Sequence, residues 1–84
     1  MITLLYFARL REAFGISSEQ AAPPAEIANI GVLLEWLRSR GGAWQIELAP
    51  DKPVRVAVNQ AMATTATPFA EGDEIALFPP VTGG

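Results

Sequence analysis

Two strongly apolar segments at opposite ends of the chain place the tightest constraint on its fold. Residues 2–7 read Ile-Thr-Leu-Leu-Tyr-Phe and residues 74–78 read Glu-Ile-Ala-Leu-Phe. Segments rich in β-branched and aromatic residues are typical of strands. Because these are the most apolar strands predicted in the chain, we expect them to be neighbours at the centre of one sheet. The long connection between them allows parallel pairing.

The alternation of side chains along these two strands predicts which residues face the core. Thr3 is the only polar residue of the first strand, so the face that carries Thr3 is expected to be the less buried one. Phe7 and Phe78 then lie on that open side. The residues expected on the core side are Ile2, Leu4, Tyr6, Ile75 and Leu77.

Phe7, Phe78 and Met62, which lies in a predicted hairpin, form a candidate partner-docking patch. One interpretation is that all three are core residues. The other is docking, because aromatic residues and methionine are enriched in interface cores. Half of the residues are hydrophobic, at 50%, and a small domain with that composition is expected to leave an apolar face open for a partner.

The middle of the chain predicts one main helix. Asn29 can cap its first turn, and Gly41-Gly42 is expected to end it. Its apolar residues recur at the spacing of one helical face. They are Ile30, Leu33, Leu34 and Leu37.

Shorter elements complete the predicted order. Gly15 is expected to end a short helix, and Asn59-Gln60 suits a tight reversal between two strands. The remaining predicted elements are a helix at residues 8–14, a weak edge strand at residues 17–20, a helical turn at residues 43–48, a strand at residues 54–58 with its three valines inward, and a strand at residues 62–65.

This order predicts an α+β fold with a mixed sheet of four to five strands and one main helix packed across it, which is a β-grasp roll. A chain of 84 residues is expected to form one domain. We assign residues 1–78 to that domain and residues 79–84 to an extended, flexible C-terminal tail.

Two missing residue types argue against catalysis by the chain alone. It contains no cysteine and no histidine, so it has no nucleophilic thiol, no thiolate metal site and no imidazole for acid–base work. Glu71, Asp73 and Glu74 cluster in a predicted turn but lack the pattern of a calcium loop. We therefore expect a solvated turn there and no metal site.

Charge and hydropathy narrow the class of partner. The net charge is −3 with six basic residues, whereas nucleic-acid binding needs a positive footprint. No apolar run approaches the ~20 residues that span a bilayer, and the apolar start is too short for a signal peptide. We expect a cytoplasmic protein without nucleic-acid or membrane partners.

The last seven residues, Phe-Pro-Pro-Val-Thr-Gly-Gly, carry the strongest functional signal. The two prolines favour an extended backbone, and the terminal glycines let a partner close around the chain. A frayed end without a role is the alternative. The residues expected to enter a partner's active site are Pro79, Pro80, Val81, Thr82, Gly83 and Gly84.

The terminal carboxylate of Gly84 is the candidate reactive group. A carboxylate is a poor electrophile until it carries a leaving group such as AMP. The chain contains no phosphate-binding loop of the Gly-rich Lys-Ser/Thr type. Activation is therefore expected from a separate enzyme that uses ATP.

Three stretches together resemble a known family. They are residues 5–12 with Gly15, residues 56–60 and residues 71–84. The chain resembles the small subunits of molybdopterin synthase, the sulfur carriers of molybdenum-cofactor biosynthesis, which have a ubiquitin-like β-grasp fold. Pro23-Pro24 departs from the family pattern near the second strand.

The resemblance implies a reaction sequence at Gly84. An adenylyltransferase related to ubiquitin-activating enzymes uses ATP with magnesium to form the acyl-adenylate, and a sulfur donor converts this to a thiocarboxylate. The large synthase subunit then takes in the tail, and the sulfur passes to cyclic pyranopterin monophosphate to build the dithiolene of molybdopterin. The resemblance also implies a heterotetramer, no cofactor bound to this chain, and an apolar docking patch that fits Phe7, Met62 and Phe78.

Three other functions remain open from the sequence. Carriers of sulfur for thiamine synthesis also end in Gly-Gly, although the Phe-Pro-Pro-Val-Thr run argues against that role. A ubiquitin-like modifier would be joined to lysines of other proteins. A plain interaction module would make no use of the tail.

Overall fold

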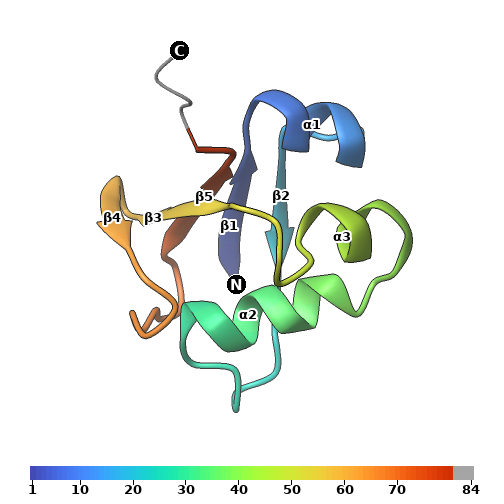
Figure 1. The fold of residues 1–84 in the computed structure, drawn as a ribbon. Helices are drawn as coiled ribbons and strands as arrows, with labels where there is room; N and C mark the ends of the chain where they lie inside the picture. The colour runs from blue at the N-terminus through green and yellow to red at the C-terminus, as the bar shows by residue number, and fades with distance from the viewer. Residues whose placement is uncertain (81–84) are drawn as a thin grey trace.

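The computed structural model describes residues 1–80, and residues 81–84 lie outside the described part. Figure 1 shows the strands gathered in one sheet with the longest helix across one side of it. The elements in chain order are β1 (Ile2–Tyr6), α1 (Ala8–Phe14), β2 (Ser18–Ala21), α2 (Ile30–Arg38), α3 (Gly42–Glu47), β3 (Arg55–Val58), β4 (Ala61–Ala63) and β5 (Glu74–Phe78).

The sheet has five strands in the order β2-β1-β5-β3-β4. The first and last strands are central neighbours and run parallel, with Leu4 opposite Ile75 and Tyr6 opposite Leu77. The other three pairings are antiparallel. This mixed sheet beneath one main helix confirms the predicted β-grasp roll.

The core lies between α2 and the sheet. Alternate residues of β1 and β5 are buried, which confirms the predicted division of their side chains between two faces. From α2, Ile30, Leu33 and Leu37 are fully buried against them. Burying an apolar side chain of this size stabilises the fold by roughly 1.5–3 kcal/mol, so this interface contributes strongly to stability.

Some of the predicted helix ends are confirmed by the structure. Asn29 Oδ1 accepts a hydrogen bond from the Val32 amide at 2.9 Å, as an N-cap, and Gly15 ends α1 with a φ of 75°. The prediction that Gly41-Gly42 ends α2 was wrong. The helix stops at Arg38 with Ser39 as its C-cap, and Gly42 instead begins α3.

Two strand predictions needed small corrections. The edge strand is Ser18–Ala21, one residue later than expected. The strand predicted at residues 62–65 is Ala61–Ala63, because the Thr64 amide donates to Thr67 Oγ1 at 2.9 Å and turns the chain away. Asn59-Gln60 forms the predicted reversal, with both φ angles positive at 49° and 71°.

Gly31 has a packing role that its sequence position did not reveal. Its amide donates to the Thr65 carbonyl oxygen at 2.9 Å. A Cβ added at Gly31 would lie 3.2 Å from that oxygen. Glycine therefore lets the first turn of α2 approach the loop after β4, which offsets its poor helix propensity.

Within residues 1–80, none of the helices has the length and apolar character needed to cross a bilayer.

Candidate functional site

The candidate site begins where β5 ends. This strand lies between β1 and β3, and its last residue, Phe78, is opposite Arg55. Pro79 and Pro80 follow directly and are half-buried. Residues 81–84 lie outside the described part of the chain. The predicted insertion of Val81, Thr82 and Gly83 into a partner's active site and the predicted reactive role of Gly84 therefore stay predictions.

The sheet face opposite α2 carries the predicted docking residues. Phe7 is 46% exposed, Met62 is 61% exposed and Phe78 is half-buried. None of the three is in the core cluster, which settles their position in favour of the open side. Their use as a docking site stays a prediction.

Phe7 and Phe78 are neighbours on this face. The parallel register pairs Leu5 with Ala76 and Tyr6 with Leu77, and the Phe7 amide donates to the Leu77 carbonyl at 3.2 Å. The register therefore brings Phe7 beside Phe78, at the end of the sheet from which the tail continues.

Met62 is joined to the two phenylalanines by small residues. Ala57 pairs with Ala76 on one side and with Met62 on the other. Ala57 is only 8% exposed although it lies outside the core cluster, so it fills the centre of the face. We call this surface the open face. Its residues are Leu5, Phe7, Ala57, Met62, Ala76 and Phe78.

Charged residues flank the open face at both ends. By strand alternation Arg55 and Glu74 point to this side, Arg55 opposite Phe78 and Glu74 beside Thr3. The apolar centre is thus bordered by one cation near the tail and one anion at the far end. A polar rim around an apolar centre is typical of protein–protein interfaces.

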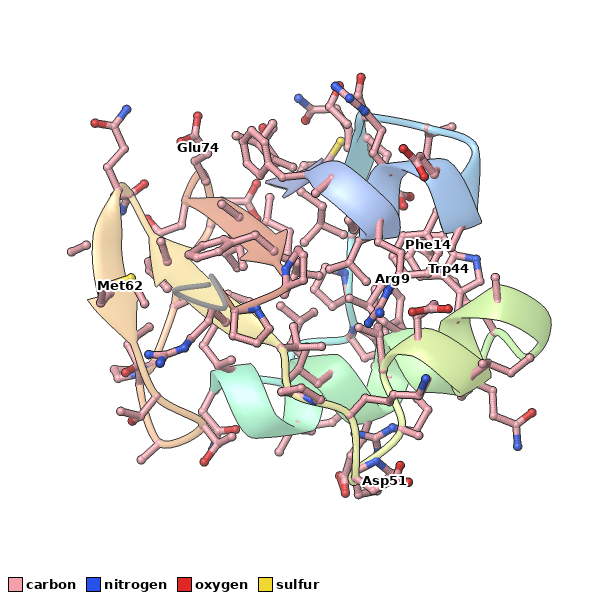
Figure 2. All side chains as sticks on the ribbon, turned by 45° about the horizontal axis from the view of Figure 1, so that its top comes forward. Arg9, Phe14, Trp44, Asp51, Met62 and Glu74 are labelled. Carbon is pink, nitrogen blue, oxygen red and sulfur yellow. The ribbon has the colours of Figure 1, made fainter. Side chains whose placement is uncertain are left out.

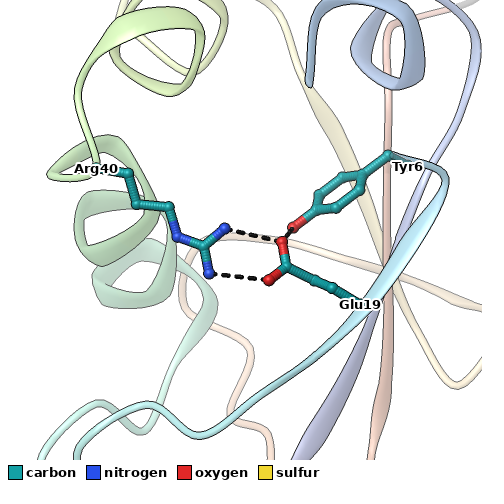
Figure 3. A network of polar contacts seen from close by, with 3 residues as sticks. All are labelled: Tyr6, Glu19 and Arg40. Carbon is teal, nitrogen blue, oxygen red and sulfur yellow. Dashed lines mark hydrogen bonds and ion pairs between the residues drawn. The ribbon is translucent and has the colours of Figure 1, made fainter. Parts of the chain in front are cut away.

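A hydrogen-bonded cluster on the core side was missed by the sequence analysis. The Tyr6 hydroxyl donates to Glu19 Oε2 at 2.7 Å, and Arg40 donates to both oxygens of the same carboxylate at 2.8 and 3.1 Å. Figure 3 shows these three groups converging from β1, β2 and the segment after α2. Such bidentate, charge-assisted contacts are stronger than neutral hydrogen bonds.

Aromatic rings extend this cluster toward α1 and α3. Phe14 and Trp44 are stacked with ring centroids 3.8 Å apart, and the Arg40 guanidinium lies 4.4 Å from the Trp44 ring centroid. Figure 2 shows Phe14 and Trp44 together, on the opposite side of the molecule from Met62. The cluster therefore links parts of the fold that lie away from Met62.

The cluster shifts the pKa values of its members. Burial raises the pKa of Tyr6, and the Glu19 carboxylate adds to this, so the phenol remains the donor. Burial alone raises the pKa of Glu19, but hydrogen bonds from Arg40 and Tyr6 outweigh it and lower the pKa. The hydrogen bonds from its partners thus hold Glu19 in its charged form.

The acidic turn before β5 is occupied by internal contacts. Asp73 accepts from the Ala70 amide at 2.9 Å and from Asn59 Nδ2 at 3.1 Å, and Glu71 pairs with the amino group of Met1. The Ala70 and Asn59 bonds lower the pKa of Asp73. Across residues 1–80, no group of three or more acidic side chains is arranged to hold a metal ion.

A model of the ThiS family matches residues 4–84. The molybdopterin synthase sulfur carrier subunit of Escherichia coli (strain K12) is 36% identical over 84 residues, with 100% of both chains covered. The Haemophilus influenzae protein of the same name is 37% identical over 84 residues, again with 100% of both chains covered.

Solved structures show the same fold. The crystal structure of SAMP1, small archaeal modifier protein 1, from Haloferax volcanii has 30% sequence identity and a TM-score of 0.80, covering 99% of this chain and 98% of that chain.

Proposed function

Since the chain belongs to the ThiS family, as the match over residues 4–84 shows, we propose that it carries sulfur for molybdopterin synthesis. Two relatives named as molybdopterin synthase sulfur carrier subunits align with it from end to end. Within this proposal, the carboxylate of Gly84 is the reactive group.

The proposed chemistry takes place on the Gly84 carboxylate. A carboxylate oxygen attacks the α-phosphorus of ATP, pyrophosphate leaves, and an acyl-adenylate forms. A donor of sulfide-level sulfur then attacks the acyl carbon, AMP leaves, and a thiocarboxylate remains. The thiocarboxylate sulfur finally bonds to cyclic pyranopterin monophosphate, and water cleaves the acyl C–S bond, so that the sulfur becomes part of the dithiolene and Gly84 returns to a carboxylate.

Two partners supply what this chain lacks. An adenylyltransferase holds the magnesium ATP, and the large synthase subunit holds the pterin substrate. The chain is then a non-catalytic subunit that binds no cofactor, works in the cytoplasm and assembles as a heterotetramer with two large subunits. The absence of cysteine and histidine from the sequence supports this division of roles.

The position of Phe78 is the observation that best supports this function. It ends the central strand β5, lies on the open face, and directly precedes the half-buried Pro79. A partner that covers the open face would therefore contact the sheet next to the residue where the tail begins. A partner that docks on the open face is therefore placed where it can also take the tail into its active site.

Deleting Gly84 tests the proposal. We expect the variant to keep the unfolding free energy of the full chain but to lose thiocarboxylate formation when incubated with the activating enzyme, ATP and a sulfur source. Intact mass spectrometry measures this, because the thiocarboxylate is heavier by the difference between sulfur and oxygen. Molybdopterin synthesis at the normal rate by the deletion variant would refute the proposal.

A protein modifier is the second candidate, because SAMP1 shares the fold at 30% identity. A modifier would form amide bonds between Gly84 and lysines of other proteins. Mass spectrometry of cell extracts separates the two functions, since lysine adducts carrying the chain support the modifier and a thiocarboxylate terminus supports the carrier.

A carrier of sulfur for thiamine synthesis is a further alternative. Such a carrier would restore growth without added thiamine in cells that lack their own thiamine sulfur carrier.

A further inference from the structure

The two charged residues that border the open face stand at its opposite ends. Arg55 is exposed and Glu74 is half-buried, and the ion pairs found within residues 1–80 all join other residues. Arg55 is level with Phe78 in the sheet, and Glu74 precedes Phe78 by four residues on β5. At ~3.3 Å per residue, the cation and the anion are therefore about 13 Å apart along the strands.

The row of residues between these two charges is apolar and small at its centre. The strand register places Leu5, Ala76, Ala57 and Met62 side by side across the sheet. Ala57 and Ala76 each carry only a methyl group, so a second sheet can approach to the ~10 Å spacing of stacked sheets. Met62 is 61% exposed and offers apolar surface that a second sheet would bury. This middle row is therefore suited to contact with another apolar sheet face.

The charges select one way of stacking two copies of the chain face to face. A twofold axis that runs along the strands would place Arg55 at the Arg55 end of the second copy and Glu74 at its Glu74 end. A twofold axis that runs across the strands, along the middle row, would instead place the Arg55 end of each copy over the Glu74 end of the other. Only the second arrangement brings opposite charges together, and it does so at both ends of the contact.

The apolar residues also suit an axis along the middle row. Each residue of that row then meets its own counterpart, with Leu5 against Leu5 and Met62 against Met62. The alanines lie at the centre, where the two sheets are closest. The contact thus has an apolar centre and a charged rim, as protein–protein interfaces do.

We propose that a second copy of the chain covers the open face, in a twofold dimer whose β5 strands run antiparallel. Arg55 of each copy pairs with Glu74 of the other. The open face has fewer residues than the about 20–30 per side of a standard interface, so we expect a transient dimer with a dissociation constant on the order of 100 µM. Because each copy covers the open face of the other, any other protein that binds this face must displace the second copy.

Sedimentation equilibrium of the purified full chain measures the dimer. Between about 10 µM and about 1 mM, the weight-average mass should rise from near that of one chain toward that of two, because dimers form by mass action. A mass that stays at that of one chain over this range overturns the proposal.

Two charge reversals test the pairing. Arg55→Glu places acids against acids at both ends of the contact, and Glu74→Arg places cations against cations. Each variant alone should dimerise about tenfold more weakly than the parent chain. Mixed in equal amounts, the two variants regain opposite charges at both ends and should form a heterodimer with the parent affinity. The chain that carries both reversals should also regain that affinity.

Matched controls change the same charges on the other side of the molecule. Lys52 is exposed and borders a hollow beside Leu34 of α2, and Glu35 is exposed on α2 itself. Lys52→Glu and Glu35→Arg should therefore dimerise as the parent chain does, which excludes an effect of net charge alone.

The rescue also decides between the two axes. An axis along the strands would leave each single reversal as weak as the parent chain and make the mixture tighter than it, and that result overturns the proposal. Single reversals that dimerise like the parent, or a mixture of variants that circular dichroism shows to be folded but that forms no heterodimer, overturn it as well.

Discussion

The phenol of Tyr6 and the carboxylate of Glu19 are joined by a 2.7 Å hydrogen bond that links the central strand β1 to the edge strand β2. Tyr6 is 1% exposed, so its hydroxyl depends on this acceptor for a partner within the protein. An unsatisfied buried hydroxyl is costly. The contact explains how a tyrosine occupies a core position that the apolar pattern alone would assign to phenylalanine or leucine.

Tyr6→Phe should weaken the fold without disturbing the packing of the ring. The variant keeps the edge contacts of the ring with Phe14 and Trp44 but removes the donor to a charged carboxylate. We expect the free energy of unfolding to fall by about 1–2 kcal/mol, measured by urea denaturation. An unchanged midpoint would indicate that Arg40 alone satisfies Glu19.

Glu19→Gln should make the free energy of unfolding fall less steeply as the pH is lowered below neutral. Because the folded protein lowers the pKa of Glu19, this residue stabilises the fold above its unfolded pKa of about 4.3, and that contribution is lost as the pH falls through the folded value. We expect the variant to be less stable than the parent chain at pH 7 and the difference to shrink toward pH 3.

Unfolding in urea at a series of pH values measures this difference. Asp73 also has a lowered pKa, so both proteins should retain some acid sensitivity, and only the part due to Glu19 should disappear. A difference between the two proteins that stays constant from pH 7 to pH 3 would contradict the assignment.

The face that each strand residue occupies could be predicted, whereas the Glu19–Arg40 pair could not. Alternation with a period of two is a local property, and it correctly separated Phe7 and Phe78 from the core. Glu19 and Arg40 are 21 residues apart, and each lies in a segment whose limits were misplaced by one to a few residues. A contact between two such segments depends on the final path of both.

Gly31 illustrates the same limit. We expect Gly31→Ala to lower the free energy of unfolding, although helix propensity alone predicts that alanine would raise it. Alanine would favour the helix by about 1 kcal/mol, but its Cβ would lie 3.2 Å from the Thr65 oxygen and 3.3 Å from Thr65 Cβ. The hydrogen bond between Gly31 and Thr65 keeps these segments together. We expect a net loss of about 1 kcal/mol, near the centre of measured single-mutant effects.

Thermal unfolding measures the effect of Gly31→Ala, and Thr65→Gly provides the control. Removing the Thr65 Cβ should reduce the loss caused by Gly31→Ala in the double variant, without abolishing it, because the carbonyl oxygen remains. Gly31→Ala proteins that melt above the parent chain would show that the loop moves away at little cost.

Met62→Ala should separate docking from folding. Met62 is 61% exposed on the open face, and Ile46, on α3, is 60% exposed on another part of the surface. Truncating either exposed side chain should change the unfolding free energy by less than about 0.5 kcal/mol.

The two variants should differ in binding. If the open face binds the large synthase subunit, Met62→Ala should weaken binding about tenfold, equivalent to about 1.4 kcal/mol, whereas Ile46→Ala should leave it unchanged. Isothermal titration calorimetry with the purified subunit measures both, and equal affinities for the two variants would place the interface elsewhere.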